Sequence, residues 1–148
     1  MGWPIRILLL LIVGFAVIQF VPYGRDHYDP LAKVEPRWDD PATRRLAQGA
    51  CLDCHSNVTS WPWYTTIAPL SWQRTRDVEK GREVLNFSRW DRPQRATIRQ
   101  VLEAILKQDM PPLQYRLVHA SARLDDAERR ELAAGLARTW KRDPPAGS

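Results

Sequence analysis

The clearest pattern along the chain is an apolar run near its start. Every residue from Ile7 to Ile18 is apolar, and the run resumes at Phe20 and Val21. A membrane-spanning helix takes about 20 such residues, whereas a secretory signal has a shorter run followed by small residues at a cleavage site. Because the residues after this run are bulky, the pattern favours an uncleaved transmembrane anchor at residues 1–22.

Downstream of a polar, proline-bounded tether at residues 23–38, the spacing of apolar residues predicts helices and no strand. The expected helices cover residues 40–51, 70–85, 92–108 and 125–142. Asp40 before Pro41 is typical of a helix start, and Asp125 with Glu128 forms a capping box. The strongest helical periodicity is that of Ile98, Val101, Leu102, Ile105 and Leu106.

Two proline-rich segments separate these helices. Residues 61–69 are mostly aromatic or apolar, and the second segment contains the adjacent Pro111 and Pro112, which we expect to prevent a helix there. The length of 148 residues suits one small domain with short appendages. The sequence therefore predicts an all-α domain at residues 39–142, followed by a tail at residues 143–148.

Composition adds a limited constraint on partners. The formal net charge is +5, but the basic residues are scattered and no basic-aromatic motif accompanies them, so nucleic acid is not an expected partner. Since the apolar segment predicts export, a basic domain is better suited to partner proteins with acidic docking surfaces.

The most specific chemical signal is a Cys-x-x-Cys-His motif formed by Cys51, Cys54 and His55, which uses both cysteines of the chain. A thioredoxin-like site would follow a strand, and zinc needs four ligands, whereas only His27 and His119 remain elsewhere. A disulfide across two residues closes too short a loop to stabilise the fold much. Cys-x-x-Cys-His is instead the attachment signature of c-type haem.

In such a site, Cys51 and Cys54 form thioethers with the porphyrin, and His55 ligates the iron. Met110 is the expected sixth ligand, because it lies between two predicted helices and is followed by the stiff Pro111–Pro112 pair. Methionine opposite histidine raises the reduction potential and suits electron transfer. His119 is the alternative sixth ligand.

Further residues are expected around the haem. The aromatic side chains of Trp61, Trp63 and Tyr64 would wall the porphyrin, and the carbonyl of Pro69 would accept the second ring N–H of His55. The candidates for pairing with the haem propionates are Trp72, Arg74, Arg82 and Trp90.

Three stretches together resemble a family of small bacterial haem-binding proteins that have an N-terminal membrane segment and one cytochrome-c-like domain. They are "CLDCHSNVTSWPWYTTIAPLSW", "GREVLNFSRW" and "MPPLQYRLVHASARLDDAE". The resemblance covers roughly residues 40–140. It implies covalent haem c at the Cys-x-x-Cys-His motif and a functional role for the "MPP" segment.

The resemblance also places "WPWY", "LNFS" and His119 in the family framework. Relatives place a histidine where this chain has Asp77, so any ligand role of that position does not apply here. The expected function is that of a monohaem cytochrome anchored in the bacterial inner membrane, with its haem domain facing the periplasm. It would pass single electrons between redox proteins and would not be an enzyme. The alternatives are a haem-based gas or ligand sensor and a peroxidase-like haem enzyme.

Overall fold

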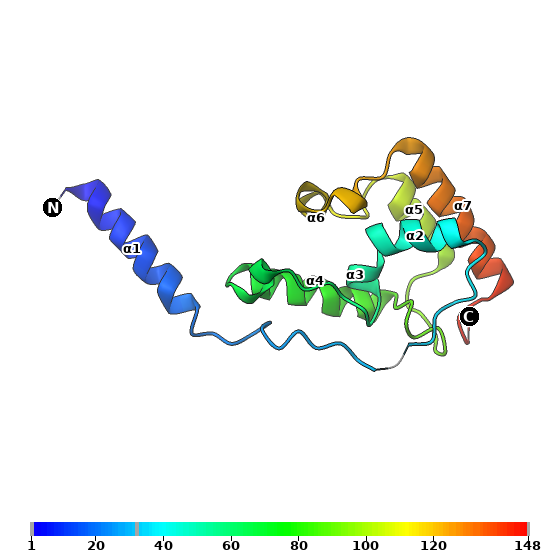
Figure 1. The fold of residues 1–148 in the computed structure, drawn as a ribbon, viewed down its shortest axis with the longest axis horizontal. Helices are drawn as coiled ribbons and strands as arrows, with labels where there is room; N and C mark the ends of the chain where they lie inside the picture. The colour runs from blue at the N-terminus through cyan, green and yellow to red at the C-terminus, as the bar shows by residue number, and fades with distance from the viewer. Residues whose placement is uncertain (1, 32, 148) are drawn as a thin grey trace. The chain divides into compact units, whose positions relative to one another are not determined.

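The computed structural model describes residues 2–31 and 33–147. Apart from one isolated bridge between Val34 and Arg89, the regular structure of these residues is helical, which confirms the all-α expectation for them. The α-helices are α1 (Trp3–Ile18), α2 (Pro41–Ala50), α3 (Leu52–His55), α4 (Leu70–Val84), α5 (Ile98–Leu106), α6 (Leu113–Val118) and α7 (Asp126–Arg142), and the 3₁₀ helices are η1 (Trp63–Thr66) and η2 (Ala120–Ala122) (Figure 1).

The chain forms two compact units. Unit 1 comprises Met1–Tyr28 and Ser60–Asp77, and unit 2 comprises Asp29–Thr59 and Val78–Ser148. Helix α4 contributes its first part to unit 1 and its last part to unit 2. The whole Cys-x-x-Cys-His motif and both candidate sixth ligands belong to unit 2.

The apolar run folds as α1, which is 16 residues long. At a rise of 1.5 Å per residue such a helix is about 24 Å long, whereas the hydrocarbon core of a bilayer is about 30 Å thick. None of the helices among the described residues is long and apolar enough to cross a membrane. The expectation of a transmembrane helix over residues 1–22 is therefore corrected to a shorter helix that ends at Ile18.

The end of α1 has a local cause in unit 1. The side-chain amide of Gln19 donates to the carbonyl of Ala68 at 3.0 Å and accepts the N–H of the same residue at 3.1 Å. These two bonds hold Gln19 against the segment that precedes α4, and Pro22 follows three residues later. The chain therefore leaves the helix before the second apolar stretch.

Helix starts were predicted best where capping residues mark them. The Asp40 side chain accepts the N–H of Ala42, and Asp125 with Glu128 forms the expected capping box of α7. Helix α5, however, begins at Ile98 and not at residue 92. Its start is set by a second capping box, formed by Thr97 and Gln100, which the sequence analysis overlooked.

The segment after Met110 also differs from the expectation. Pro111 and Pro112 were expected to prevent a helix, but α6 begins directly after them, with Pro112 as its N-cap residue. Proline lacks an N–H donor, and the first residues of a helix need none because their N–H groups have no intrahelical acceptor. The proline pair therefore marks a helix start.

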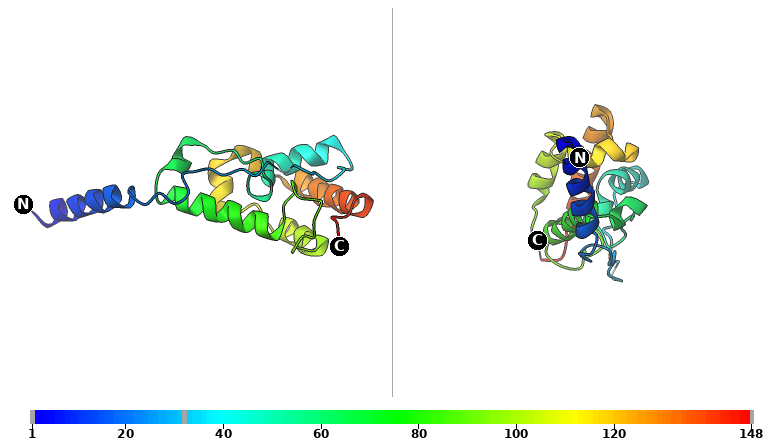
Figure 2. Two further views of the ribbon diagram at one scale, coloured as in Figure 1. Left: turned by 90° about the horizontal axis from the view of Figure 1, so that it is seen from below. Right: turned by 90° about the vertical axis from the view of Figure 1, so that its left-hand side faces the viewer.

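The core of unit 2 lies where α7 packs against both α2 and α5 (Figures 1 and 2). Leu132 and Leu136 of α7 and Ile105 of α5 are almost fully buried in it. The helices α2 and α7 come close because Gly135 lies against Thr43, so that an added Cβ would stand 2.0 Å from its hydroxyl oxygen. The motif therefore follows a helix that is closely packed against α7.

An ion pair in unit 2 makes the stability of the fold dependent on pH. Arg44 donates to both carboxylate oxygens of Glu35, at 2.9 and 3.0 Å, and these bonds lower the pKa of Glu35 despite its partial burial. A carboxyl whose pKa is lower in the folded state stabilises the fold above its unfolded pKa, and this contribution is lost as the pH falls through the folded value.

We therefore expect Glu35→Gln to lower the free energy of unfolding at neutral pH and to reduce its loss on acidification. Urea unfolding at neutral pH and at about pH 3 measures both quantities. The same acid-induced loss in the variant and the wild type would contradict this assignment.

Candidate haem site

The Cys-x-x-Cys-His motif forms one helical turn at the end of α2. The N–H of Cys51 closes α2 on the carbonyl of Ala47 at 2.7 Å, and the N–H groups of Cys54 and His55 both bond to the carbonyl of Cys51. No disulfide joins these two cysteines, and each is only partly exposed. The turn therefore presents two thiols and one imidazole within five residues.

The environment of Cys51 is unsuited to thiol redox chemistry. Burial, reinforced by the neighbouring Cys54, raises the pKa of the Cys51 thiol to about 12. Reactive cysteines in oxidoreductases have lowered pKa values and a positive surrounding, because the thiolate is the nucleophile. The surroundings of Cys51 therefore disfavour its thiolate, which thiol–disulfide exchange requires.

The imidazole of His55 is held by the end of α4. Its Nδ1 lies 3.0 Å from both the Gly81 and the Leu85 carbonyl oxygens. Two carbonyl acceptors require the proton on Nδ1, which leaves the lone pair of Nε2 for a metal. Burial lowers the pKa of His55, so that the neutral ring, which is the ligating form, is favoured.

The acceptor predicted for His55 was wrong. The carbonyl of Pro69, directly before α4, accepts the N–H of Gln73 at 3.1 Å, whereas Nδ1 of His55 lies against the carbonyls of Gly81 and Leu85. The sequence did not reveal these acceptors, because backbone carbonyls carry no residue-type signal. Gly81 and Leu85 lie in the "GREVLNFSRW" stretch, which contributed to the sequence analysis only through the family resemblance.

Two glycines let neighbouring backbone approach the motif. A Cβ on Gly81 would stand 2.3 Å from the carbonyl oxygen of Cys54, and one on Gly49 would stand 2.8 Å from that of Ser121. Both distances are shorter than any van der Waals contact. Helix α4 therefore packs closely against the motif at Cys54, and η2 packs closely against the end of α2 at Gly49.

Buried polar groups fix the backbone after His55. The carbonyl of His55 accepts the N–H of Phe87 at 2.7 Å, and the side-chain amide of Asn86 donates to Asn57 at 2.9 Å. The hydroxyl of Ser88 accepts the N–H of Asn57 at 3.0 Å. These bonds account for the "LNFS" segment, whose polar residues are buried although nothing in their spacing predicts it.

Three of the four candidates for propionate pairing have protein partners. Arg82 donates to the carbonyl of Ser56 and to the side chains of Asp29 and Thr59 in unit 2. In unit 1, Arg74 donates to the carbonyl of Ser60. In unit 2, the indole N–H of Trp90 donates to the backbone carbonyl of Asp143. The buried indole N–H of Trp72 has no hydrogen-bond partner among the described residues.

The predicted aromatic wall lies in unit 1. Trp61 stacks on His27, with ring centroids 4.5 Å apart, and Trp63 packs edge-on against Tyr64. Trp63 is 76% exposed, a large fraction for an indole. The contact of these three aromatic residues with a haem stays a prediction.

The two candidates for the sixth ligand differ in their surroundings. Met110 is 43% exposed, and its N–H is bonded to the carbonyl of Ala104 at the end of α5. The His119 ring instead stacks on Tyr115 at 3.8 Å, and its Nδ1 lies 3.1 Å from the Tyr115 carbonyl oxygen. The ring of His119 is thus engaged within its own segment, while the thioether of Met110 is accessible.

Several apolar side chains that flank Met110 in the sequence remain exposed. We call this set the apolar patch, and it consists of Leu106, Met110, Leu113, Leu117 and Val118, between 43% and 67% exposed. Of these residues, only Met110 was predicted from the sequence to belong to a site. The i, i+4 spacing of Leu113 and Leu117 becomes informative once α6 is known to be a helix.

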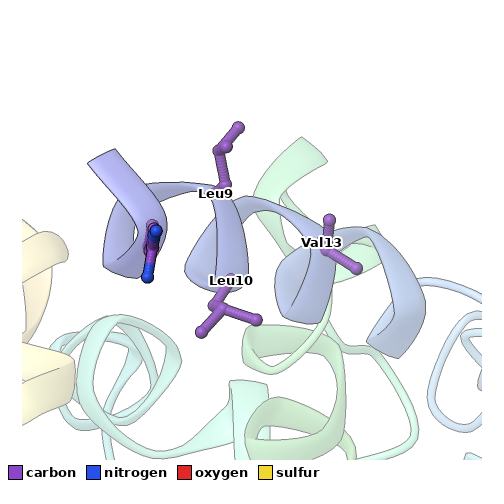
Figure 3. Close-up of a pocket in the computed structure, with 4 residues that line it drawn as sticks. Leu9, Leu10 and Val13 are labelled. Atoms are coloured by element: carbon purple, nitrogen blue, oxygen red, sulfur yellow. The ribbon is translucent and has the colours of Figure 1, made fainter. Parts of the chain in front are cut away.

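These features of unit 2 fit a haem. Two unbridged cysteines and an imidazole whose Nδ1 is engaged by two carbonyls lie on one turn, and exposed apolar side chains flank the candidate ligand Met110. A depression on α1 does not compete, because its lining residues Arg6, Leu9, Leu10 and Val13 include no iron ligand (Figure 3).

Comparison with known proteins identifies the family. No curated protein and no solved structure gave a significant match to the chain. A family model described as "Haem-binding domain" matches residues 13–138, which is most of the chain and contains the motif, the apolar patch and both candidate sixth ligands. The chain therefore belongs to the haem-binding domain family.

Proposed function

We propose that this haem-binding protein is a c-type cytochrome, in which Cys51 and Cys54 attach one haem covalently and His55 ligates its iron. The observation that carries the proposal is the single turn with two unbridged thiols and an imidazole whose Nδ1 is engaged by two carbonyls. When bound, the haem supplies an iron that takes up and releases one electron.

The residues of the chain orient and shield that group. The carbonyls of Gly81 and Leu85 hold the His55 ring and increase its basicity, which strengthens it as an iron ligand. The exposed apolar side chains near Met110 would pack against a bound haem, and Met110 would supply a thioether to its iron. The proposed role is electron transfer without catalysis.

We place this cytochrome outside the cytoplasm, at the periplasmic face of the bacterial inner membrane. The support is the chemistry of haem attachment, which takes place outside the cytoplasm, and the apolar α1 at the N-terminus. Its proposed partners are redox proteins with acidic docking surfaces, in keeping with the basic net charge. Fractionation of cells that express the full chain tests the location, and recovery in the cytoplasm would contradict it.

A spectrum and a redox titration test the function. The full chain, expressed with a haem-attachment system, should bind one haem that survives denaturation. It should also show a low-spin six-coordinate spectrum and titrate reversibly with one electron. A high-spin five-coordinate spectrum would instead favour the ligand sensor or the peroxidase-like enzyme.

Two substitutions separate the candidate sixth ligands. We expect Met110→Ala to abolish the methionine–iron charge-transfer band in the near infrared and to lower the reduction potential, because a thioether stabilises the reduced iron. His119→Phe keeps an aromatic ring against Tyr115 and should retain that band. Loss of the six-coordinate spectrum in His119→Phe alone would assign the ligand to His119.

A further inference from the structure

A hydrogen bond connects α6 directly to the haem-attachment turn. The hydroxyl of Tyr115 donates to the Oδ2 of Asp53 at 2.6 Å, and Asp53 lies between Cys51 and Cys54. The bond joins residues 62 positions apart, and its short distance is typical of a hydroxyl donating to a carboxylate. It therefore links the segment that contains Met110 to the segment that contains His55.

A second contact holds the same two segments together. The hydroxyl of Ser121, in η2, lies 3.5 Å from the carbonyl oxygen of Gly49, two residues before Cys51. The missing side chain of Gly49 allows this approach. The α6–η2 segment thus touches the chain both before Cys51 and between the two cysteines.

The Tyr115 side chain is itself restrained. The ring of His119 stacks on it with an interplanar angle of 14°, and the Nδ1 of His119 lies 3.1 Å from the Tyr115 carbonyl oxygen. Stacking against a neighbour in the same segment limits rotation of the phenol. His119 therefore supports the direction of the hydroxyl toward Asp53.

Met110 is coupled to Tyr115 through a short, stiff piece of chain. Pro111 and Pro112 follow it immediately, the N–H of Tyr115 bonds to the carbonyl of Pro112 at 3.0 Å, and the N–H of Met110 bonds to Ala104. The fixed φ angles of two prolines leave little freedom between Met110 and α6. The position of α6 thereby constrains the backbone that bears the Met110 side chain.

We propose that Tyr115 is a positioning residue that, through Asp53, holds the Met110 segment against the haem-attachment turn and keeps the sixth coordination position closed. The inference rests on the proposed ligation by Met110. It assigns to Tyr115 and Asp53 a role in restricting access of external ligands to the iron, in addition to any contribution to folding.

Imidazole binding to the oxidised haem-loaded chain tests this role, because imidazole must displace the sixth ligand. We expect Tyr115→Phe to bind imidazole about tenfold more tightly than the wild type, the factor that corresponds to losing one hydrogen bond to a charged acceptor. Asp53→Ala should have the same effect, and the double variant no larger one, because both changes remove the hydrogen bond between Tyr115 and Asp53. Asp53→Asn keeps an acceptor and should lie closer to the wild type.

Tyr28→Phe is the matched control, because Tyr28 is 69% exposed and lies in unit 1. Hydrogen exchange of the full chain without haem supplies a second measurement, in which Tyr115→Phe should accelerate exchange in the 108–122 region.

Three outcomes would contradict the inference. If Tyr115→Phe binds imidazole with wild-type affinity while Met110→Ala loses its charge-transfer band, only the role of Tyr115 is overturned. An unchanged band in Met110→Ala would overturn both the ligation and this inference, and unchanged exchange would overturn the restraint itself.

Discussion

Replacing Cys51 and Cys54 together by alanine should abolish all haem that survives denaturation. In the structure both thiols lie on the turn that ends in His55, and they are not joined by a disulfide. Thioethers are the only covalent links that this turn can make to a porphyrin, and the chain has no other cysteine. Each single variant retains one thiol and should keep a reduced amount of covalent haem.

Haem staining after denaturing electrophoresis of the full chain measures this loss, with Val58→Ala as the control. Val58 follows the motif by three residues and is 52% exposed, so its truncation should leave attachment unchanged. Covalent haem in the double alanine variant would refute the proposed attachment site. Absence of haem from the wild type in a competent host would refute the c-type assignment altogether.

The second large effect is expected for Gly81→Ala. The added Cβ would stand 2.3 Å from the carbonyl oxygen of Cys54 and 2.9 Å from its carbonyl carbon, both backbone atoms that cannot rotate away. Helix α4 and the motif must therefore separate. Such overpacking costs about 1–3 kcal/mol, which exceeds the usual gain of about 0.5–1 kcal/mol on replacing a helical glycine by alanine.

Separation of α4 from the motif also affects the iron ligand. Gly81 and Leu85 hold Nδ1 of His55, so a displaced α4 lengthens at least one of these bonds. We expect a lower free energy of unfolding in urea together with a raised reduction potential, because weaker hydrogen bonding makes the imidazole a poorer donor to oxidised iron. A merely structural defect would lower the stability without moving the potential.

Gly14→Ala provides the comparison for this prediction. Gly14 lies in α1, and a Cβ placed there meets nothing within 4 Å. Alanine has the higher helix propensity, so this variant should unfold at a denaturant concentration no lower than that of the wild type. Equal stability of Gly81→Ala and the wild type would show that α4 yields without cost and would contradict the proposed close contact.

Local sequence rules predicted part of the fold and failed at identifiable residues. The caps at Asp40 and Asp125 could be predicted because each aspartate side chain accepts a backbone N–H two or three residues further along the chain. The start of α5 was misplaced because the Thr97–Gln100 box was overlooked. Helix α6 was missed because Pro112 was interpreted as a helix breaker. A proline directly before the first helical turn does not disrupt the helix, because the N–H that it lacks would have no intrahelical acceptor.

Residue types and their spacing were enough to identify the Cys-x-x-Cys-His motif and membership of a haem-binding family. The groups that orient the motif became visible in the three-dimensional fold: the carbonyls that hold His55 and the tyrosine that donates to Asp53. The reason is physical. Attachment depends on residue type and short spacing, whereas orientation depends on hydrogen bonds between segments distant in sequence, and backbone carbonyls look alike at every position of a chain.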